Sequence, residues 1–204
     1  DFDIFDIEKE DCKNMDSSKF YAIFSGTHGI ANGLDNILNA ASKIQDMGEE
    51  DIRIILIGDG KLKPHLKNRC LDESIENVIF MDSVNKHQLA KIHKNVHVGL
   101  QLLTNVEAFY YGTSPNKFFD YLASSLPVIS NYPGWVSELI IQNKCGLYAD
   151  PNSPDSLALK LIEMKNDKEM LEKFRKNSKQ LGKKNFSRDL LAEKWCRFIE
   201  DCCL

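Results

Sequence analysis

The residues best suited to chemistry lie in the segment 112–123, whose sequence is GTSPNKFFDYLA. Ser114 is a favourable N-cap and Pro115 fits the first helical position, so we predict that a helix begins there. The unpaired N–H groups at a helix start, with Lys117 in the first turn, are suited to holding a phosphate. Asp120 lies three residues after Lys117 and shares its face of the helix. The same spacing also fits an ordinary capped helix with solvated polar side chains, and the segment alone leaves both interpretations open.

The elements that must position this segment are indicated by hydrophobic patterning. Short apolar runs predict six strands, at residues 20–25, 52–57, 78–81, 96–103, 127–130 and 146–149. The first helix between them carries an apolar stripe from Ile30 to Ile44, and the helix through His93 begins with a capping pair, Asn85 and Gln88. Further helices are expected at about residues 61–70, 135–142, 168–183 and 188–203, and after a start signal at Ser153-Pro154.

Strands that alternate with helices predict parallel, right-handed crossovers. We therefore predict an α/β fold: a doubly wound, six-stranded parallel sheet in the order 3-2-1-4-5-6, Rossmann-like, with C-terminal helices. Residues 19–204 form this domain. Residues 1–18 are acidic and lack a clear period, so we expect a linker or the end of a missing N-terminal domain, outside the core. The first residue is not methionine, which indicates a fragment or a processed chain.

Two loops suited to phosphate are brought together by this topology. The strand order reverses between the first and fourth strands, and ligands bind outside the carboxyl ends of the strands at that point. The loop 26–29 (GTHG) follows the first strand, and the loop into Lys117 follows the fourth. The loop 58–60 (GDG) lies beside them. This convergence favours a phosphate site over an ordinary capped helix.

Several activities are disfavoured by missing motifs. The sequence has no G-x-G-x-x-G, and Asp59 follows Gly29 by about thirty residues rather than about twenty, which argues against a nicotinamide enzyme. It also lacks the P-loop motif and the G-x-S-x-G of serine hydrolases. His93 and His97 lie four apart without a third ligand, so we expect no metal site. The net charge of −4 argues against a nucleic-acid partner.

Composition and cysteine spacing favour a cytoplasmic protein. With 43% hydrophobic and 27% charged residues, the chain can bury a full core. It shows neither a signal peptide nor an apolar run near the roughly 18 residues of a membrane span. Its six cysteines form no C-x-x-C pair, which fits reduced thiols better than disulfides or zinc.

Taken together, these segments resemble the C-terminal domain of GT-B fold glycosyltransferases of the retaining "group 1" type, family four. That domain has a glycine-bearing loop after its first strand, G-D-G after its second, and a block P-x-K-x-x-E-Y-x-A-x-x-x-P-V-I that runs into its fifth. Here these are residues 25–29, 57–60 and 114–129, and residues 131–140 and 146–147 are similar to the segments that follow. The resemblance covers about residues 20–200, and its third block is fairly specific.

The resemblance implies a nucleotide-sugar donor site that needs neither a metal nor a further cofactor. Lys117 and the backbone amides of residues 114–117 would hold the diphosphate, and Asp120 matches a glutamate that accepts hydrogen bonds from the ribose hydroxyls. The backbone around residues 84–86 would meet the base. The implied donor-binding residues are Gly26, Thr27, His28, Gly29, Gly58, Asp59, Val84, Lys86, Gly112, Thr113, Ser114, Pro115, Asn116 and Asp120.

The sequence also departs from the family pattern. Where the family has an arginine and a lysine after the first strand, this sequence has Thr27 or His28, and Asn32. Gly112 stands where the family has its first glutamate. Either Glu107 serves from a shifted loop, as a catalytic residue beside Lys117, or the sugar is held differently. His28 is a further candidate for stabilising the leaving group.

The expected function is donor binding in a retaining glycosyltransferase of the hexosyl or N-acetylhexosaminyl type. The donor is of the UDP or GDP type, with UDP favoured, and the pathway is bacterial surface polysaccharide synthesis, such as lipopolysaccharide or capsule. The acceptor would bind a missing N-terminal domain, which brings the enzyme to the cytoplasmic face of a membrane. Alone, the chain should bind nucleotide weakly and transfer nothing. The alternatives are a nucleotide-sugar epimerase of the same fold and a non-catalytic nucleotide-binding or interaction module.

Overall fold

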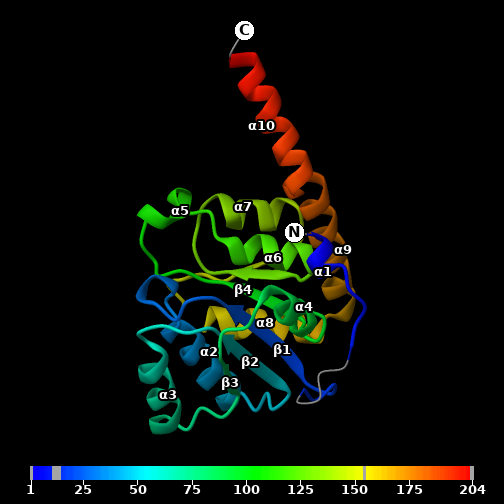
Figure 1. The fold of residues 1–204 in the computed structure, drawn as a ribbon. Coiled ribbons are helices and arrows are strands. Elements are labelled where there is room, and N and C mark those ends of the chain that lie inside the picture. Colours follow the sequence, from blue (N-terminus) through cyan, green and yellow to red (C-terminus); the bar gives the residue numbers. More distant parts are fainter. Residues whose placement is uncertain (1, 11–14, 154, 203–204) are drawn as a thin grey trace.

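Six short apolar runs become the strands of one sheet in the computed structural model, which describes residues 2–10, 15–153 and 155–202 (Figure 1). The strands are β1 (Phe20–Ser25), β2 (Ile52–Ile57), β3 (Val78–Met81), β4 (Val98–Gln101), β5 (Val128–Ser130) and β6 (Gly146–Tyr148). Their order is β3-β2-β1-β4-β5-β6 and every pair is parallel, which confirms the predicted doubly wound topology. Pro154, expected at a helix start, lies outside the described residues, as do Cys12 and Cys203.

The fourth strand is shorter than the predicted run 96–103. It ends at Gln101, although Leu102 and Leu103 are buried beyond it. The side chain of Asn131 replaces a neighbouring strand there: it accepts from the Leu103 N–H at 2.9 Å and donates to the Leu103 carbonyl at 3.1 Å. Leu102 and Leu103 therefore still pack in the core, although the backbone has left the strand and entered the loop.

Helices connect the strands and close the chain. They are α1 (Phe2–Phe5), the 3₁₀ turn η1 (Ile30–Asn32), α2 (Asp35–Asp46), α3 (Lys63–Asp72), α4 (Lys86–His93), α5 (Ala108–Gly112), α6 (Asn116–Ala123), α7 (Trp135–Gln142), α8 (Ser156–Asn166), α9 (Lys168–Phe186) and α10 (Arg188–Cys202). The predicted capping box of α4 is present, because Asn85 and Gln88 bond each other's backbone N–H. None of the described helices has the length and apolarity that a membrane crossing requires.

Helices cover both faces of the sheet (Figure 1), and the core forms one layer on each face because side chains alternate along the strands. Ala22 and Phe24 of β1 point to the face covered by α2, α3 and α8, whereas Tyr21 and Ile23 point to the face covered by α4, α6 and α7. The predicted stripe of the first helix begins at Leu34 rather than Ile30. Ile30 lies in η1 and is 77% exposed, because Gly33 turns the chain into the left-handed region at φ 57° before α2 starts.

The chain ends differ in how they pack on this core. The expectation that residues 1–18 lie outside the core is wrong for Phe5, which is buried and stacks on His93 with ring centroids 5.6 Å apart. At the other end, α9 packs along α6, and α10 extends away from the sheet with none of its side chains buried (Figure 1).

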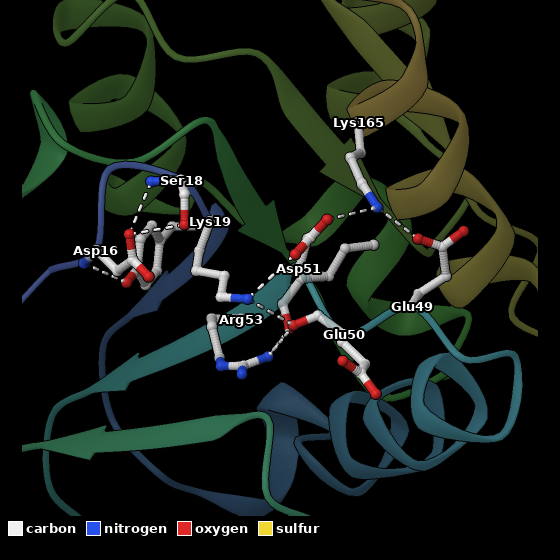
Figure 2. A network of polar contacts seen from close by, with 10 residues as sticks. Asp16, Ser18, Lys19, Glu49, Glu50, Asp51, Arg53 and Lys165 are labelled. Atoms are coloured by element: carbon white, nitrogen blue, oxygen red, sulfur yellow. Dashed lines mark hydrogen bonds and ion pairs between the residues drawn. The ribbon is translucent and has the colours of Figure 1, made fainter.

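A network of charged residues closes the edge of the sheet where β1 and β2 begin (Figure 2). Lys19 donates to the Asp51 carboxylate at 3.1 Å and to the Glu50 carbonyl at 3.3 Å. Lys165, from α8, reaches Glu49 at 2.5 Å and Asp51 at 3.7 Å. These pairs join the start of β2 to α8. The opposite edge, where the strands end, carries the candidate site.

Candidate functional site

A crevice of about 460 Å³ opens at the carboxyl ends of the strands, where the strand order reverses. Four parts of the chain line it: the end of β1 with the loop after it (Ser25, Gly26, Thr27), the end of β2 with the loop after it (Ile57, Gly58, Asp59), the loop after β3 with α4 (Ser83, Val84, Leu89), and α6 (Asn116, Lys117, Asp120). The loops after the first and fourth strands therefore meet, as the predicted topology requires.

The loops after β1 and β2 pack backbone against backbone. A Cβ atom on Gly58 would lie 1.9 Å from the Gly26 carbonyl oxygen, and one on Gly60 would lie 2.5 Å from the His28 carbonyl oxygen. Both glycines have positive φ, 143° and 152°. Only glycine permits this approach and this conformation, and this explains the G-D-G sequence physically.

His28 contributes to the site through its backbone. Its N–H donates to the Asp59 carbonyl at 2.8 Å, and its carbonyl accepts from the Leu62 N–H at 3.0 Å. The ring is fully buried, and neither nitrogen has a hydrogen-bond partner among the described residues. Burial, together with the charge of Lys63, lowers the pKa of the ring. The ring is not among the residues that line the crevice, so the suggested role of His28 in leaving-group stabilisation stays a prediction.

Lys117 extends from α6 to the loop after β1. Its Nζ donates to Asn32 Oδ1 at 3.1 Å and lies 4.6 Å from the centre of the Phe24 ring. A methyl group on Gly26 would lie 3.1 Å from Lys117 Cε, which shows how closely the chain passes this glycine. Burial lowers the pKa of the amine to about 8. Among the described residues no carboxylate pairs with it, so an anion in the crevice would supply the missing counter-charge.

Asp120 stands on the same face of α6 and is held by Lys86. Lys86 Nζ donates to Asp120 Oδ1 at 2.9 Å, with the Asp120 side chain 15% exposed and that of Lys86 48% exposed. A carboxylate accepts several hydrogen bonds, so the second oxygen stays available to hydroxyl groups. Lys86 itself is not among the crevice-lining residues, although Val84, two residues earlier, is.

Tyr121 fixes α6 to the sheet and thereby positions Lys117 and Asp120. Its ring passes over Gly99 of β4, where a Cβ would lie 2.5 Å from the ring. Its buried hydroxyl accepts from the Ser25 N–H at 3.2 Å and lies 3.2 Å from the Ile23 carbonyl. The second turn of α6 is thus fixed against the end of β1, which supplies the facing loop.

Replacing Tyr121 with phenylalanine should lower the free energy of unfolding by about 1–3 kcal/mol, because the buried Ser25 N–H loses its acceptor. Chemical denaturation measures the change. Tyr148→Phe is the matched control, because its half-buried hydroxyl has no hydrogen-bond partner among the described residues, and it should change the value by less than about 0.5 kcal/mol. Equal stabilities of the two variants would contradict the anchoring role.

The start of α6 differs from the prediction. The helix begins at Asn116, its N-cap is Pro115, and no side chain caps it, so Ser114 is not the N-cap. The preceding segment is held from the side: Trp135 Nε1 donates to the Thr113 carbonyl at 2.8 Å. The N–H groups of Asn116 and Lys117 remain at the helix start beside the crevice, whereas Pro115 has no N–H to offer.

Some of the predicted site residues are gathered in the crevice and others are not. Those that line it are Gly26, Thr27, Gly58, Asp59, Val84, Asn116, Lys117 and Asp120. Those outside its lining are His28, Gly29, Lys86, Glu107, Gly112, Thr113, Ser114 and Pro115. Glu107 is exposed and immediately precedes α5.

Sequence reasoning also missed crevice residues. Ser25 and Ile57 are the last residues of β1 and β2, so their position at strand ends was a usable signal. Ser83 and Leu89 gave no such signal. In the described part of the chain, no group of three or more His, Cys, Asp or Glu side chains could hold a metal ion.

The class of protein follows from this fold and from the family comparison. Residues 6–181 match the family model described as glycosyl transferases group 1, so the chain belongs to that family. This confirms the resemblance drawn from the sequence motifs.

Similarity to one curated protein and two solved structures shows how much of each chain is matched. The uncharacterized glycosyltransferase MJ1178 of Methanocaldococcus jannaschii is 25% identical over 164 residues, which cover 80% of this chain and 43% of that protein. HepE of Anabaena, solved in complex with UDP and glucose, shares the fold with a TM-score of 0.75 and 14% identity, covering 90% of this chain and 48% of HepE. The C-terminal domain of LpcC, a glycosyl transferase group 1 family protein of Francisella tularensis, shares the fold with a TM-score of 0.67 and 17% identity. The match covers 83% of this chain and 87% of the LpcC domain.

These shares agree with a C-terminal domain. The chain spans less than half the length of the curated relatives it matches, but most of the isolated LpcC domain.

Proposed function

We propose that this chain is the donor-binding domain of a retaining glycosyltransferase whose donor is a nucleotide sugar, with UDP favoured. One observation carries the proposal: the Lys117 amine lies at the crevice, beside Gly26 and the start of α6, without a carboxylate partner among the described residues. A cation with a lowered pKa next to free helix N–H groups is suited to a diphosphate. That HepE was solved with UDP supports the nucleotide.

Each crevice wall then has a chemical role. Lys117, with the N–H groups of Asn116 and Lys117, holds the diphosphate and stabilises the charge that develops as the sugar leaves. Asp120 accepts hydrogen bonds from the ribose hydroxyls with the oxygen that Lys86 does not occupy. The loop after β3, with Val84, lies against the base. No step in this scheme calls for a metal ion.

An acceptor domain outside this chain completes the active site, and the transferred group is a hexosyl or N-acetylhexosaminyl unit. The pathway is bacterial surface polysaccharide synthesis, lipopolysaccharide or capsule, at the cytoplasmic face of a membrane. Residues 112–117 (GTSPNK) and the turn 131–135 (NYPGW) resemble bacterial transferases of surface polysaccharide assembly, which supports this assignment.

A thermal-shift screen with UDP, GDP, ADP and UDP-sugars tests the donor site. A nucleotide that binds only the folded state at a hundred times its Kd adds about 2.7 kcal/mol to the free energy of unfolding, so UDP should raise the melting temperature by several degrees. GDP and ADP serve as matched controls of equal charge and should shift it less. If millimolar UDP leaves the melting temperature unchanged, the donor-site proposal fails.

A second candidate, a nucleotide-binding module that transfers nothing, is favoured by one observation. Glu107, the suggested replacement for the missing family glutamate, does not line the crevice, whose carboxylates are Asp59 and Asp120. Transfer assays on the protein with its acceptor domain separate the two. Sugar transfer supports the enzyme, whereas nucleotide binding without transfer from any donor supports the module.

A further inference from the structure

Lys63 lies behind the crevice with its ammonium group buried between two loops. It is the first residue of α3 and only 7% exposed. Its Nζ donates to the Gly58 carbonyl at 2.8 Å, the Met81 carbonyl at 3.2 Å and the Asp82 carboxylate at 2.7 Å. An ammonium group has three donors, so all of them are used.

The carbonyl contacts matter more than the ion pair. The Asp82 side chain is 97% exposed, so the surrounding water weakens its attraction to the Lys63 ammonium group, whose side chain is 9% exposed. The Gly58 N–H also donates to the Met81 carbonyl, at 3.2 Å, so Lys63 reinforces a backbone contact between the ends of β2 and β3. An apolar side chain at this position would leave the buried carbonyl of Gly58 without this donor, which is unfavourable.

We propose that Lys63 is a positioning residue that sets the spacing of the loops after β2 and β3, and so shapes the nucleoside side of the crevice. Lys63 is not among the residues that line the crevice, and it acts through Gly58 and through the segment that runs from Met81 to Val84. Lys117 acts on the other side, at the diphosphate. The inference rests on the proposed function, which assigns these walls to the nucleoside and the phosphates.

Calorimetric titration of the whole chain with UMP and UDP distinguishes the two lysines. Lys63→Met should weaken both nucleotides by the same factor, at least about tenfold, so that the ratio of their Kd values is unchanged. Lys117→Met should instead weaken UDP far more than UMP. Lys63→Arg, which keeps a buried donor, should restore part of the affinity. Lys61→Met is the matched control: this exposed lysine lies two residues earlier, and its loss should change neither Kd.

The titrations separate the positioning role of Lys63 from the proposed nucleotide-binding function. Folded Lys63→Met with wild-type affinity for both nucleotides overturns the positioning role, and so does a loss confined to UDP. If Lys63→Met is unfolded at the assay temperature, Lys63→Gln replaces it, because its amide retains a donor; at least a threefold loss for both nucleotides is expected, and none overturns the inference. A wild-type chain that binds neither nucleotide rejects the proposed function, and the positioning role with it.

Discussion

Lys117→Met should weaken UDP binding by at least about tenfold, because a charge-assisted contact to phosphate contributes about 1.5–3 kcal/mol. In the protein with its acceptor domain, Lys117→Ala should lower donor turnover by at least about tenfold, since in the proposed function the same amine stabilises the leaving diphosphate. Calorimetry and donor-turnover assays measure the two effects. Lys176→Met, an exposed lysine of α9, is the control and should change neither. Unchanged turnover in Lys117→Ala would remove this residue from the mechanism.

The affinity for UDP should depend on pH through the Lys117 amine. In the unliganded protein, burial lowers the pKa of Lys117 to about 8. A bound diphosphate favours the charged amine and raises its pKa, so binding above pH 8 requires proton uptake. The affinity should therefore fall by up to about tenfold per pH unit above pH 8, a range in which UDP is already fully ionised. In Lys117→Met this fall should be absent, and its persistence there would assign the proton to another group.

Stability should change in the opposite direction from affinity. The amine has a pKa of about 8 in the folded chain and about 10.4 when unfolded. Between these values the unfolded chain binds more protons, so the free energy of unfolding rises with pH there, and below pH 8 the folded state carries the full cost of the buried charge. Lys117→Met removes this cost and should raise the melting temperature at pH 7. Equal or higher stability with lost affinity would mark a functional rather than a structural lysine.

The fold was predictable because its signals are local. Each strand coincides with an apolar run, and the alternation of strands and helices leaves few topologies, so the sheet order followed. What failed were features decided by tertiary contacts. Ile30 continues the helical period of apolar residues, but Gly33 adopts a left-handed conformation that separates Ile30 from α2. Phe5 lies in an acidic segment without periodicity, and it is buried by tertiary contacts with His93 and with Ala90 and Ala123.

The site was predictable only in part, because sequence spacing shows which strand ends meet but not where each side chain points. The crevice-lining positions of Gly58 and Lys117 followed from the topology. The burial of His28 did not follow from the topology. A histidine in a glycine-rich loop is a reasonable candidate for ligand contact until the residues around it are known. The role of Lys63 could not be predicted either, because its three acceptors come from two other segments and leave no pattern within its own helix.

Gly58→Ala should be the most damaging small substitution at the site. The added methyl group would lie 1.9 Å from the Gly26 carbonyl oxygen, and alanine is strained at a φ of 143°. Overpacking and backbone strain each cost about 1–3 kcal/mol, so the free energy of unfolding should fall by roughly 2–6 kcal/mol. Chemical denaturation of the variant measures this loss, and calorimetry should show that the protein which remains folded binds UDP more weakly, because the loop that carries Gly26 is displaced from Lys117.

Gly112→Ala is the matched control for this prediction. Gly112 lies in the segment where the family has its first glutamate, yet a Cβ there would meet no atom within 4 Å. The substitution should therefore change the free energy of unfolding by less than about 0.5 kcal/mol. If Gly58→Ala were as stable as Gly112→Ala, the loops after β1 and β2 could not be packed backbone against backbone. The crevice would then lose the wall that brings Gly26 to Lys117, and with it the geometry on which the diphosphate site depends.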